Sequence, residues 1–300
     1  MRIVYGLFAG FAWLVSKMPD GVLYGLSDFF CFVIKHLLRY RKAIIYGNLK
    51  RSFPEFSDKD IKKLIHAYYK HMADLVLEVI KTPGLPAAEI KSRFHFKNPE
   101  VLHKIDKSGK SVILLTGHLG NWEWLGPGLQ LNFPEFSGHA VVKPLSNKYF
   151  DTYINDLRRL HKKDSIIPFK QTLRYMIKNK HKRTLTLFAA DQTPHRSEIS
   201  FNMPFLNQTT PFFTGFEKIA KMLDQAVVFI NLYRTKRGHY EVEFHLITDD
   251  PNASGEFEIT HEFVRLLEKS IRERPYNWLW SHRRWKYAPK EVHLENKNTA

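Results

Sequence analysis

From about residue 92 onward, short runs rich in β-branched and aromatic residues alternate with longer amphipathic stretches. We expect strands at 112–115, 140–142, 184–188, 227–232 and 240–247, and helices between several of them at 148–161, 171–179 and 212–223. Strands that alternate with helices assemble into layered folds in which helices cover a sheet. The sequence therefore predicts an α/β fold with a mixed, mostly parallel central sheet flanked by helices.

The first third of the chain has a different, helical character. Residues 3–15 and 22–38 are apolar, and the second stretch carries Asp28 and Lys35. Neither stretch is a clear transmembrane helix, and the second is a poor isolated span that suits a helix lying half sunk in a bilayer. Five cations follow them and suit anionic headgroups on the cytoplasmic side: Arg39, Arg41, Lys42, Lys50 and Arg51. The alternative is two ordinary core helices followed by a solvated basic surface.

Helix signals mark the transition to the rest of the chain. Ser57 followed by Asp60 is typical of a helix start, helical periodicity continues to Val79, and Thr82-Pro83-Gly84 ends it. We predict an N-terminal helical membrane-associating region over 1–56, an α/β domain over 57–290, and a polar tail over 291–300.

Charge and composition limit the classes of partner and cofactor. The net charge of +16 implies an acidic partner, but it does not choose between nucleic acid, anionic lipid, a phosphorylated substrate and an acidic carrier protein. Cys31 is the single cysteine, so no intrachain disulfide can form, as suits a reducing cytosolic face. The 15 histidines show no metal-ligand spacing, so we expect no metal.

The stretch VILLTGHLGNWEW, residues 112–124, places a histidine and a glutamate just after the end of a predicted buried strand. Gly117 allows a tight turn, His118 follows the strand, and Asn121 can cap a short helix whose first turn holds Glu123. The carboxyl ends of strands are where open α/β sheets bind ligands. Imidazole accepts a proton near neutral pH, and a carboxylate can orient it. The spacing fits a catalytic base and its orienting acid, or an ordinary structural pair.

The order of several motifs then carries a resemblance. The segment TGHLGNWE resembles the His-x4-Asp/Glu motif of the bacterial lipid A biosynthesis acyltransferases, within the lysophospholipid acyltransferase superfamily. The chain is similar to that family over nearly its whole length, through KMPDGVLYGLSDFFCFV, NLKRSFPEFS, VVKPLSNKYFDTYINDLRR, TLFAADQTP, MPFLNQTTPF, AVVFINLYR and RPYNWLWSHRRWK, in the family's order.

The resemblance implies an activity and its partners. It implies transfer of a fatty acyl group from an acyl thioester, usually that of acyl carrier protein (ACP) and otherwise acyl-CoA, to a hydroxyl of a lipid A precursor. The expected place is the cytoplasmic face of the inner membrane, with anionic lipids as neighbours and without a cofactor or nucleic acid. His118 would act as the base and Glu123 as its acidic partner, and the hydroxyl would attack the thioester directly because the motif holds no serine or cysteine.

The resemblance also implies a set of substrate-binding residues. Asn121 lies inside the catalytic turn. Lys143, where the family usually has arginine, would join Asn147 and Arg158 in holding phosphate or carrier acid groups. A solvated basic helix face is the alternative for these cations.

Two further segments complete the predicted site. Asp191 and Gln192 match the family's Asp-Gln pair at a second strand end, and are expected to orient substrate, although an aspartate that starts a turn is common. Arg234 follows a β-rich run and is expected to reach the same cleft.

Two features of the later sequence bear on the fold. Phe205-Leu206-Asn207 replaces the family's Phe-Phe-Gly, and Asn is the residue most able to replace Gly at positive φ. Pro211 matches the usual start of the next helix. The aromatic and basic residues at 278–285 suit either a membrane interface or closure of the fold's edge.

Two other functions remain open at this stage. The first is acyl transfer to another lipid alcohol, since the base chemistry does not depend on which alcohol is bound. The second is a non-enzymatic basic protein that binds nucleic acid or a membrane surface. Against the second, the basic residues are scattered and no nucleic-acid motif is present.

Overall fold

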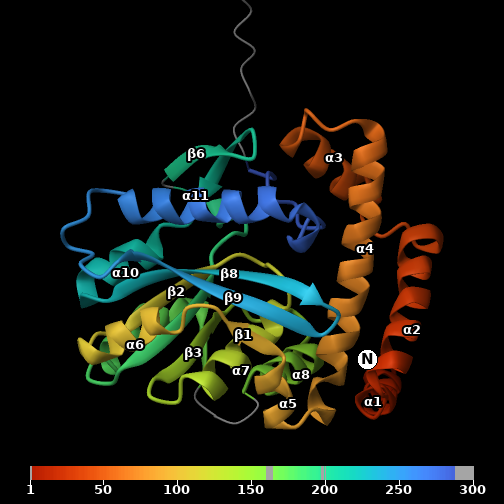
Figure 1. Cartoon of the computed structure of the whole chain (residues 1–300), viewed down its shortest axis with the longest axis horizontal. Helices are drawn as coiled ribbons and strands as arrows, with labels where there is room; N and C mark the ends of the chain where they lie inside the picture. The colour runs from red at the N-terminus through yellow and green to blue at the C-terminus, as the bar shows by residue number, and fades with distance from the viewer. Residues whose placement is uncertain (1, 160–164, 197–198, 200, 288–300) are drawn as a thin grey trace, which may run out of the picture.

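The computed structural model describes residues 2–159, 165–196, 199 and 201–287, and its centre is a seven-stranded sheet (Figure 1). The strand order is β1-β9-β8-β2-β5-β3-β4, and only the β8–β9 pair is antiparallel. The strands are β1 (Phe94–Phe96), β2 (Val112–Thr116), β3 (Ser137–Val142), β4 (Ile166–Pro168), β5 (Thr184–Ala189), β8 (Ala226–Lys236) and β9 (His239–Thr248). The predicted mixed, mostly parallel sheet is confirmed.

Helices cover the sheet on its two faces. They are α5 (Ala87–Ser92), α6 (Glu100–Lys107), α7 (Trp122–Asn132), α8 (Lys148–Arg159), α9 (Thr172–Lys178), α10 (Gly215–Leu223) and α11 (Glu258–Glu273), with 3₁₀ turns η3 (Phe169–Gln171) and η5 (Pro275–Asn277). In Figure 1, α10 and α11 lie on one side of the sheet, and α7 and α8 on the other. The strand β2 is central and buried at all five positions, because neighbours and helices enclose it.

The N-terminal third is helical, as predicted. It comprises α1 (Arg2–Ser16), α2 (Asp20–Phe32), the π-helix η1 (Val33–Leu37), α3 (Lys42–Ser52), α4 (Asp58–Lys81) and the 3₁₀ turn η2 (Thr82–Gly84). The hydroxyl of Ser57 accepts a hydrogen bond from the Asp60 amide, which confirms the predicted start of the long helix. Helices α1 and α2 pack along α4 (Figure 1).

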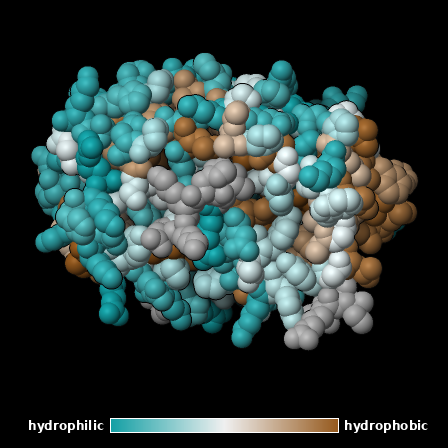
Figure 2. Space-filling view, turned by 90° about the horizontal axis from the view of Figure 1, so that it is seen from below, coloured by the Kyte–Doolittle hydropathy of each residue, from teal (hydrophilic) through white to brown (hydrophobic). Residues whose placement is uncertain are grey.

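The outer side of these helices is apolar and exposed. Hydrophobic residues gather at the end of the molecule formed by α1 and α2, on the right of Figure 2. Exposed fractions reach 73% at Leu7, 63% at Trp13 and 67% at both Leu37 and Leu38. Other exposed members are Val4, Phe11, Leu14, Val22, Phe29 and Phe32. A contiguous apolar patch of this kind marks an interaction surface.

The lengths of the apolar helices limit how they can meet a bilayer. Among the described residues, no helix on its own is both long and apolar enough to cross one. Asp20–Leu37 and Lys42–Ser52 together meet the length and composition criteria, but they are bent by 90°.

The structure corrects one predicted helix start and adds short strands. Pro211 lies in strand β7 (Gln208–Phe212), which forms an antiparallel hairpin with β6 (Phe201–Phe205), and α10 begins only at Gly215. At the hairpin turn Leu206 and Asn207 have φ of 51° and 61°, so the expected left-handed backbone at Asn207 is present. The predicted polar tail over 291–300 lies outside the described residues.

Candidate active site

Two adjacent parallel strands bring His118 and Asp191 together. His118 follows β2, Asp191 follows β5, and Thr116 pairs with Ala189 at the end of the ladder. Gly117 is needed at this turn, because a Cβ there would lie 2.6 Å from Cδ1 of Leu267 and 3.3 Å from Oδ2 of Asp191. The prediction that both segments meet at one sheet edge is confirmed.

Asp191 holds His118 at two points. Nδ1 of His118 lies 2.6 Å from Oδ1 of Asp191, and the His118 backbone amide donates to Oδ2 at 2.9 Å. The indole Nε1 of Trp278 also donates to Oδ2, at 2.6 Å. An ionised carboxylate that accepts these bonds requires a proton on Nδ1, which leaves Nε2 as the basic nitrogen.

The C-terminal segment holds the turn in place. Leu119 forms an isolated bridge with Trp278, and the Gly120 amide donates to the carbonyl of Asn277. Gly120 has φ of 53°, and a Cβ there would lie 3.0 Å from Cγ of Leu232. The aromatic motif near the C-terminus therefore closes the fold behind the turn that holds His118, which was one of its two predicted roles.

The Asp191 carboxylate controls the ionisation of the imidazole. Burial lowers the pKa of His118, but the charge and hydrogen bond of Asp191 outweigh burial and raise it above its usual 6.5. Burial raises the pKa of Asp191, and the His118 contacts outweigh it and hold that pKa well below its usual range. The pair therefore favours an ionised Asp191 beside a histidine that binds a proton readily.

Glu123 has a different partner from the one predicted. Its carboxylate binds Arg158 at two points, Oε2 to Nε at 2.8 Å and Oε1 to Nη2 at 2.7 Å, and Oε1 also accepts from Nε1 of Trp122 at 3.2 Å. The expected His118–Glu123 hydrogen bond is thus replaced by His118–Asp191. The planar guanidinium of Arg158 fits the carboxylate better than a single imidazole N–H does. Glu123 still adds to the positive shift in the pKa of His118.

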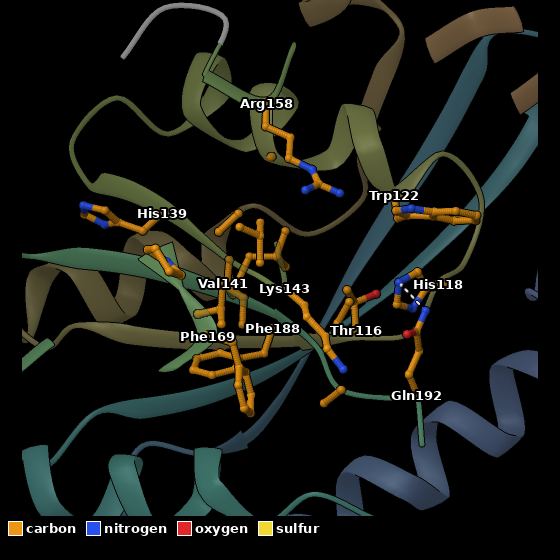
Figure 3. A pocket seen from close by; sticks show the side chains of 18 of the residues that line it. Thr116, His118, Trp122, His139, Val141, Lys143, Arg158, Phe169, Phe188 and Gln192 are labelled. Atoms are coloured by element: carbon orange, nitrogen blue, oxygen red, sulfur yellow. Dashed lines mark hydrogen bonds between the residues drawn. The ribbon is translucent and has the colours of Figure 1, made fainter. Parts of the chain in front are cut away.

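The other ring nitrogen of His118 faces a polar, exposed side. Nε2 lies 3.1 Å from Nε2 of the Gln192 amide (Figure 3). Since Nδ1 carries the proton, the amide N–H of Gln192 donates to the lone pair of Nε2. The lone pair on this nitrogen can therefore accept a hydrogen bond from a donor on this side.

His118 and Gln192 lie at the end of a large cavity, of about 1100 Å³. Its walls come from β2, β3 and β5, from α7 and α8, and from η3. In Figure 3 Thr116, His118, Trp122 and Gln192 lie at one end, and His139 lies at the other. Between them the lining is largely apolar, including Val141, Phe169, Leu185, Leu187 and Phe188.

One face of α7 follows the cavity over about two turns. Glu123, Gly126 and Gln130 line it, at the three- and four-residue spacing that places side chains on one helix face. From Glu123 to Gln130 the helix rises by about 10 Å at ~1.5 Å per residue. The cavity is therefore long as well as apolar, and has a titratable group at one end.

Two predicted cations lie at this cavity. Lys143, at the end of β3, and Arg158, on α8, both line it. Arg158 already neutralises Glu123, whereas Lys143 has no ion pair among the described side chains. Lys143 is therefore the stronger candidate for binding an anionic group of a ligand.

Asn121 and Asn147, two other predicted site residues, stabilise helix starts instead of lining the cavity. Asn121 is fully buried, because its amide oxygen caps α7 at the Trp124 amide and its amide nitrogen donates to the buried carboxylate of Glu78. The oxygen of Asn147 accepts from the amides of Tyr149 and Phe150 at the start of α8. Neither residue lines the cavity in the described structure.

Arg234 also lies away from the cavity. It forms a 2.6 Å ion pair with Asp74, a fully buried residue of α4, and its guanidinium stacks on Tyr276. The long β8–β9 hairpin carries it toward the N-terminal helices. The prediction that Arg234 reaches the cleft is wrong.

One protein-family model matches almost the whole chain. The family model of the bacterial lipid A biosynthesis acyltransferases matches residues 2–287. The chain belongs to this family. It is an O-acyltransferase of the late lipid A type, and His118 and Asp191 occupy the predicted motifs TGHLGNWE and TLFAADQTP.

Curated relatives agree with the family over similar spans. A lipid A biosynthesis palmitoleoyltransferase of Escherichia coli (strain K12) is 22% identical over 93% of this chain and 90% of its own length. A lipid A biosynthesis lauroyltransferase of the same strain is 24% identical over 94% of this chain and 91% of its own length. A lipid A biosynthesis acyltransferase of Haemophilus influenzae is 24% identical over 94% of this chain and 84% of its own length.

In this acyltransferase, sequence reasoning missed three residues at or behind the site. Trp278 was noted only as part of an aromatic motif, yet it anchors Asp191. Trp122 lies edge-on to His118 with ring centroids 5.2 Å apart, and Gly126 opens the middle of the cavity. Gly126 lies three residues after Glu123 and four after Trp122, and this spacing was a signal that it shares a helix face with each of them.

Proposed function

We propose that this acyltransferase moves a fatty acyl group from an ACP thioester to a hydroxyl of a lipid A precursor, with His118 as general base. The observation that carries the proposal is the position of Nε2 of His118 at the head of a long apolar cavity, with Nδ1 held by Asp191. An extended hydrocarbon chain fits such a cavity, and a basic nitrogen at its head meets the acyl carbonyl end.

The reaction follows from this geometry. The acceptor hydroxyl donates to Nε2 of His118 and attacks the thioester carbonyl carbon as its proton moves to the ring. The tetrahedral intermediate collapses, the C–S bond breaks, and the imidazolium returns the proton to the leaving thiolate. Asp191 stabilises the imidazolium between the two steps, because its charge lies 2.6 Å from Nδ1.

The polar side chains around His118 divide the remaining work. Glu123 fixes Arg158 at the cavity wall and adds negative charge near the imidazole, so it supports the base without orienting it. We assign Lys143 and Arg158 to phosphate groups of the acceptor or the donor, since both line the cavity head with positive charge. Gln192 holds Nε2 until the hydroxyl displaces it.

Location at a membrane is part of the proposal. The exposed apolar side of α1, α2 and η1 gives a surface that inserts into the bilayer, and Arg39 and Lys42 lie exposed beside it for anionic headgroups. Not all of the predicted basic residues serve this role: Lys50 pairs with Asp58, Arg51 bonds Gln208, and Arg41 bonds the Ser281 carbonyl. A lipid acceptor would reach the cavity from this side.

The test is transfer in vitro with a panel of donors and acceptors. Purified protein in detergent or vesicles is given acyl-ACP or acyl-CoA, with a lipid A precursor or a lysophospholipid as the acceptor, and products are read by mass. The proposal expects an acyl-lipid A product with acyl-ACP as the better donor. Transfer only to the phospholipid acceptor, or no transfer from any thioester, would contradict it.

A further inference from the structure

Helix α9 and the turn before it present a one-sided basic surface. Two cations and two apolar residues of α9 follow each other at spacings of three and four, so they share one helix face: Leu173, Arg174, Ile177 and Lys178, with Lys170 in the turn before the helix and His181 after it. All six are exposed, with Leu173 at 39% and Ile177 at 43%. We call these residues the α9 face.

The α9 face has an uncompensated charge. The sequence holds no aspartate or glutamate from 165 to 183. Among the described residues, Lys170, Arg174 and Lys178 take part in no ion pair. By contrast, Arg159 on the neighbouring α8 pairs with Asp156. A cluster of cations kept free of acids attracts an acidic partner, and the two apolar side chains between them supply the contact that charge alone does not.

The α9 face is continuous with the cavity. Phe169, Lys170 and Gln171 form the turn that starts α9, and all three line the cavity wall. Figure 3 shows Phe169 among the lining side chains near Lys143. A macromolecule bound on the α9 face is therefore beside the cavity that receives its cargo.

Two other basic surfaces in the described part of the chain lack this combination. The cations at the start of α4, such as Lys59 and Lys62, are exposed but do not line the cavity. The cations that follow η1 adjoin the apolar helices. Packing of α9 is against β4 and η3 at the sheet edge, while the large exposed apolar surface belongs to α1, α2 and η1. A carrier protein therefore explains the α9 face better than a membrane does.

We propose that the α9 face is the docking surface for the acidic carrier protein that delivers the acyl thioester, an inference that rests on the proposed function. The carrier's carboxylates meet Lys170, Arg174 and Lys178, its apolar side chains cover Leu173 and Ile177, and its thioester arm enters the cavity past Phe169. Because these contacts lie outside the reacting centre, they set the affinity for the donor and leave the chemical step unchanged.

The test reverses charge on this face. Arg174→Glu with Lys178→Glu is compared with the matched control Lys59→Glu with Lys62→Glu, which makes the same change in net charge on α4. We expect the α9 variant to raise KM for acyl-ACP by roughly tenfold to a hundredfold, with kcat unchanged at saturation. Its rate with acyl-pantetheine, a donor without the carrier protein, should equal that of the wild type. The control should leave every constant unchanged.

Three outcomes would overturn the docking assignment. They are an unchanged KM for acyl-ACP, an equal rise for acyl-pantetheine, and loss of binding to anionic phosphatidylglycerol vesicles with no change in KM for the carrier. The last outcome would make the α9 face a membrane contact. If the wild type transfers from no thioester, the proposed function itself fails, which is a separate result.

Discussion

Replacing Asp191 by asparagine tests how the imidazole is held. Oδ2 of Asp191 accepts from two N–H groups, the His118 amide and the Trp278 indole, while Oδ1 faces Nδ1 of His118. Asparagine has one side-chain oxygen, which can accept from both N–H groups only at the Oδ2 position. Its amide nitrogen then takes the Oδ1 position and faces Nδ1 of His118. Nδ1 must then accept a hydrogen bond, the proton moves to Nε2, and His118 has the wrong tautomer for a base.

The magnitude follows from the loss of base catalysis. Proton abstraction by a positioned group contributes about 10² to 10⁴ in rate, which is about 3–5 kcal/mol of barrier. Each hydrogen bond at position 191 changes from a charged kind, about 1.5–3 kcal/mol, to a neutral kind, about 0.5–1.5 kcal/mol. The lower cost of burying a neutral amide offsets part of that loss. Activity should therefore fall much more than stability.

The pH dependence of kcat/KM shows in which direction Asp191 shifts the pKa of His118. Only neutral His118 can accept a proton, and Asp191 holds its pKa above 6.5, so with His118 as the proposed base wild-type kcat/KM should fall on the acid side at a pH above 6.5. In Asp191→Asn the main cause that raises the pKa of His118 is gone, while burial, which lowers it, and the smaller raising effect of Glu123 remain. The acid limb of the residual activity should move to lower pH.

The assay is acyl transfer followed by product mass over about pH 5–8, with urea unfolding as the control for stability. An Asp191→Asn variant with near-normal kcat would refute the tautomer argument. An acid limb that stays at the wild-type position would refute the assignment of Asp191 as the cause of the raised pKa.

Two further changes test the cavity and the packing of α4. Gly126→Leu should shift products toward shorter acyl chains, because a Cβ at Gly126 meets no atom within 4 Å and its side chain would enter the cavity; unchanged chain preference in a donor competition would show that the acyl chain lies elsewhere. Burial and nearby Arg234 lower the pKa of His71 to about 3. His71 stays neutral in the folded state, whereas in the unfolded state it takes up a proton below about pH 6.5. The free energy of unfolding therefore decreases as the pH falls from 6.5 toward 3. Between pH 7 and pH 5 the free energy of unfolding of the wild type should fall by about 2 kcal/mol more than that of His71→Leu, at ~1.36 kcal/mol per pH unit. Equal falls for the two proteins in urea unfolding would refute this.

The sequence was most informative where strand patterns end in polar residues. The runs before His118 and Asp191 are buried parallel neighbours, and any two such strands bring their carboxyl ends to the same edge. That rule alone places both residues at one site. It does not say which carboxylate faces the ring, because this depends on how α7 is rotated.

The rotation of α7 about its axis determines which side chain Glu123 binds. It lies in the first turn of α7, five residues after His118 in the chain, yet its carboxylate points to Arg158 on α8. Asp191 is distant in sequence and reaches His118 through the parallel ladder. A spacing motif reports which residues are close along the chain, and says little about side-chain direction across helices.

Other misses have similar physical causes. Strands β1 and β4 have only three residues each, which is too short for a period-two pattern to be recognised. Arg234 lies on a β8–β9 hairpin whose length takes its end to Asp74 instead of the cavity. Asn121 was identified as a helix cap correctly, and its burial follows from that same role.

The central claim is that His118 takes the proton from the acceptor hydroxyl. The most direct measurement is the turnover of purified His118→Ala with saturating acyl-ACP and lipid A precursor, after its circular dichroism spectrum and vesicle binding have been matched to the wild type. Turnover should fall by about 10² to 10⁴, while folding and membrane binding are retained. A folded His118→Ala protein that acylates at the wild-type rate would contradict it.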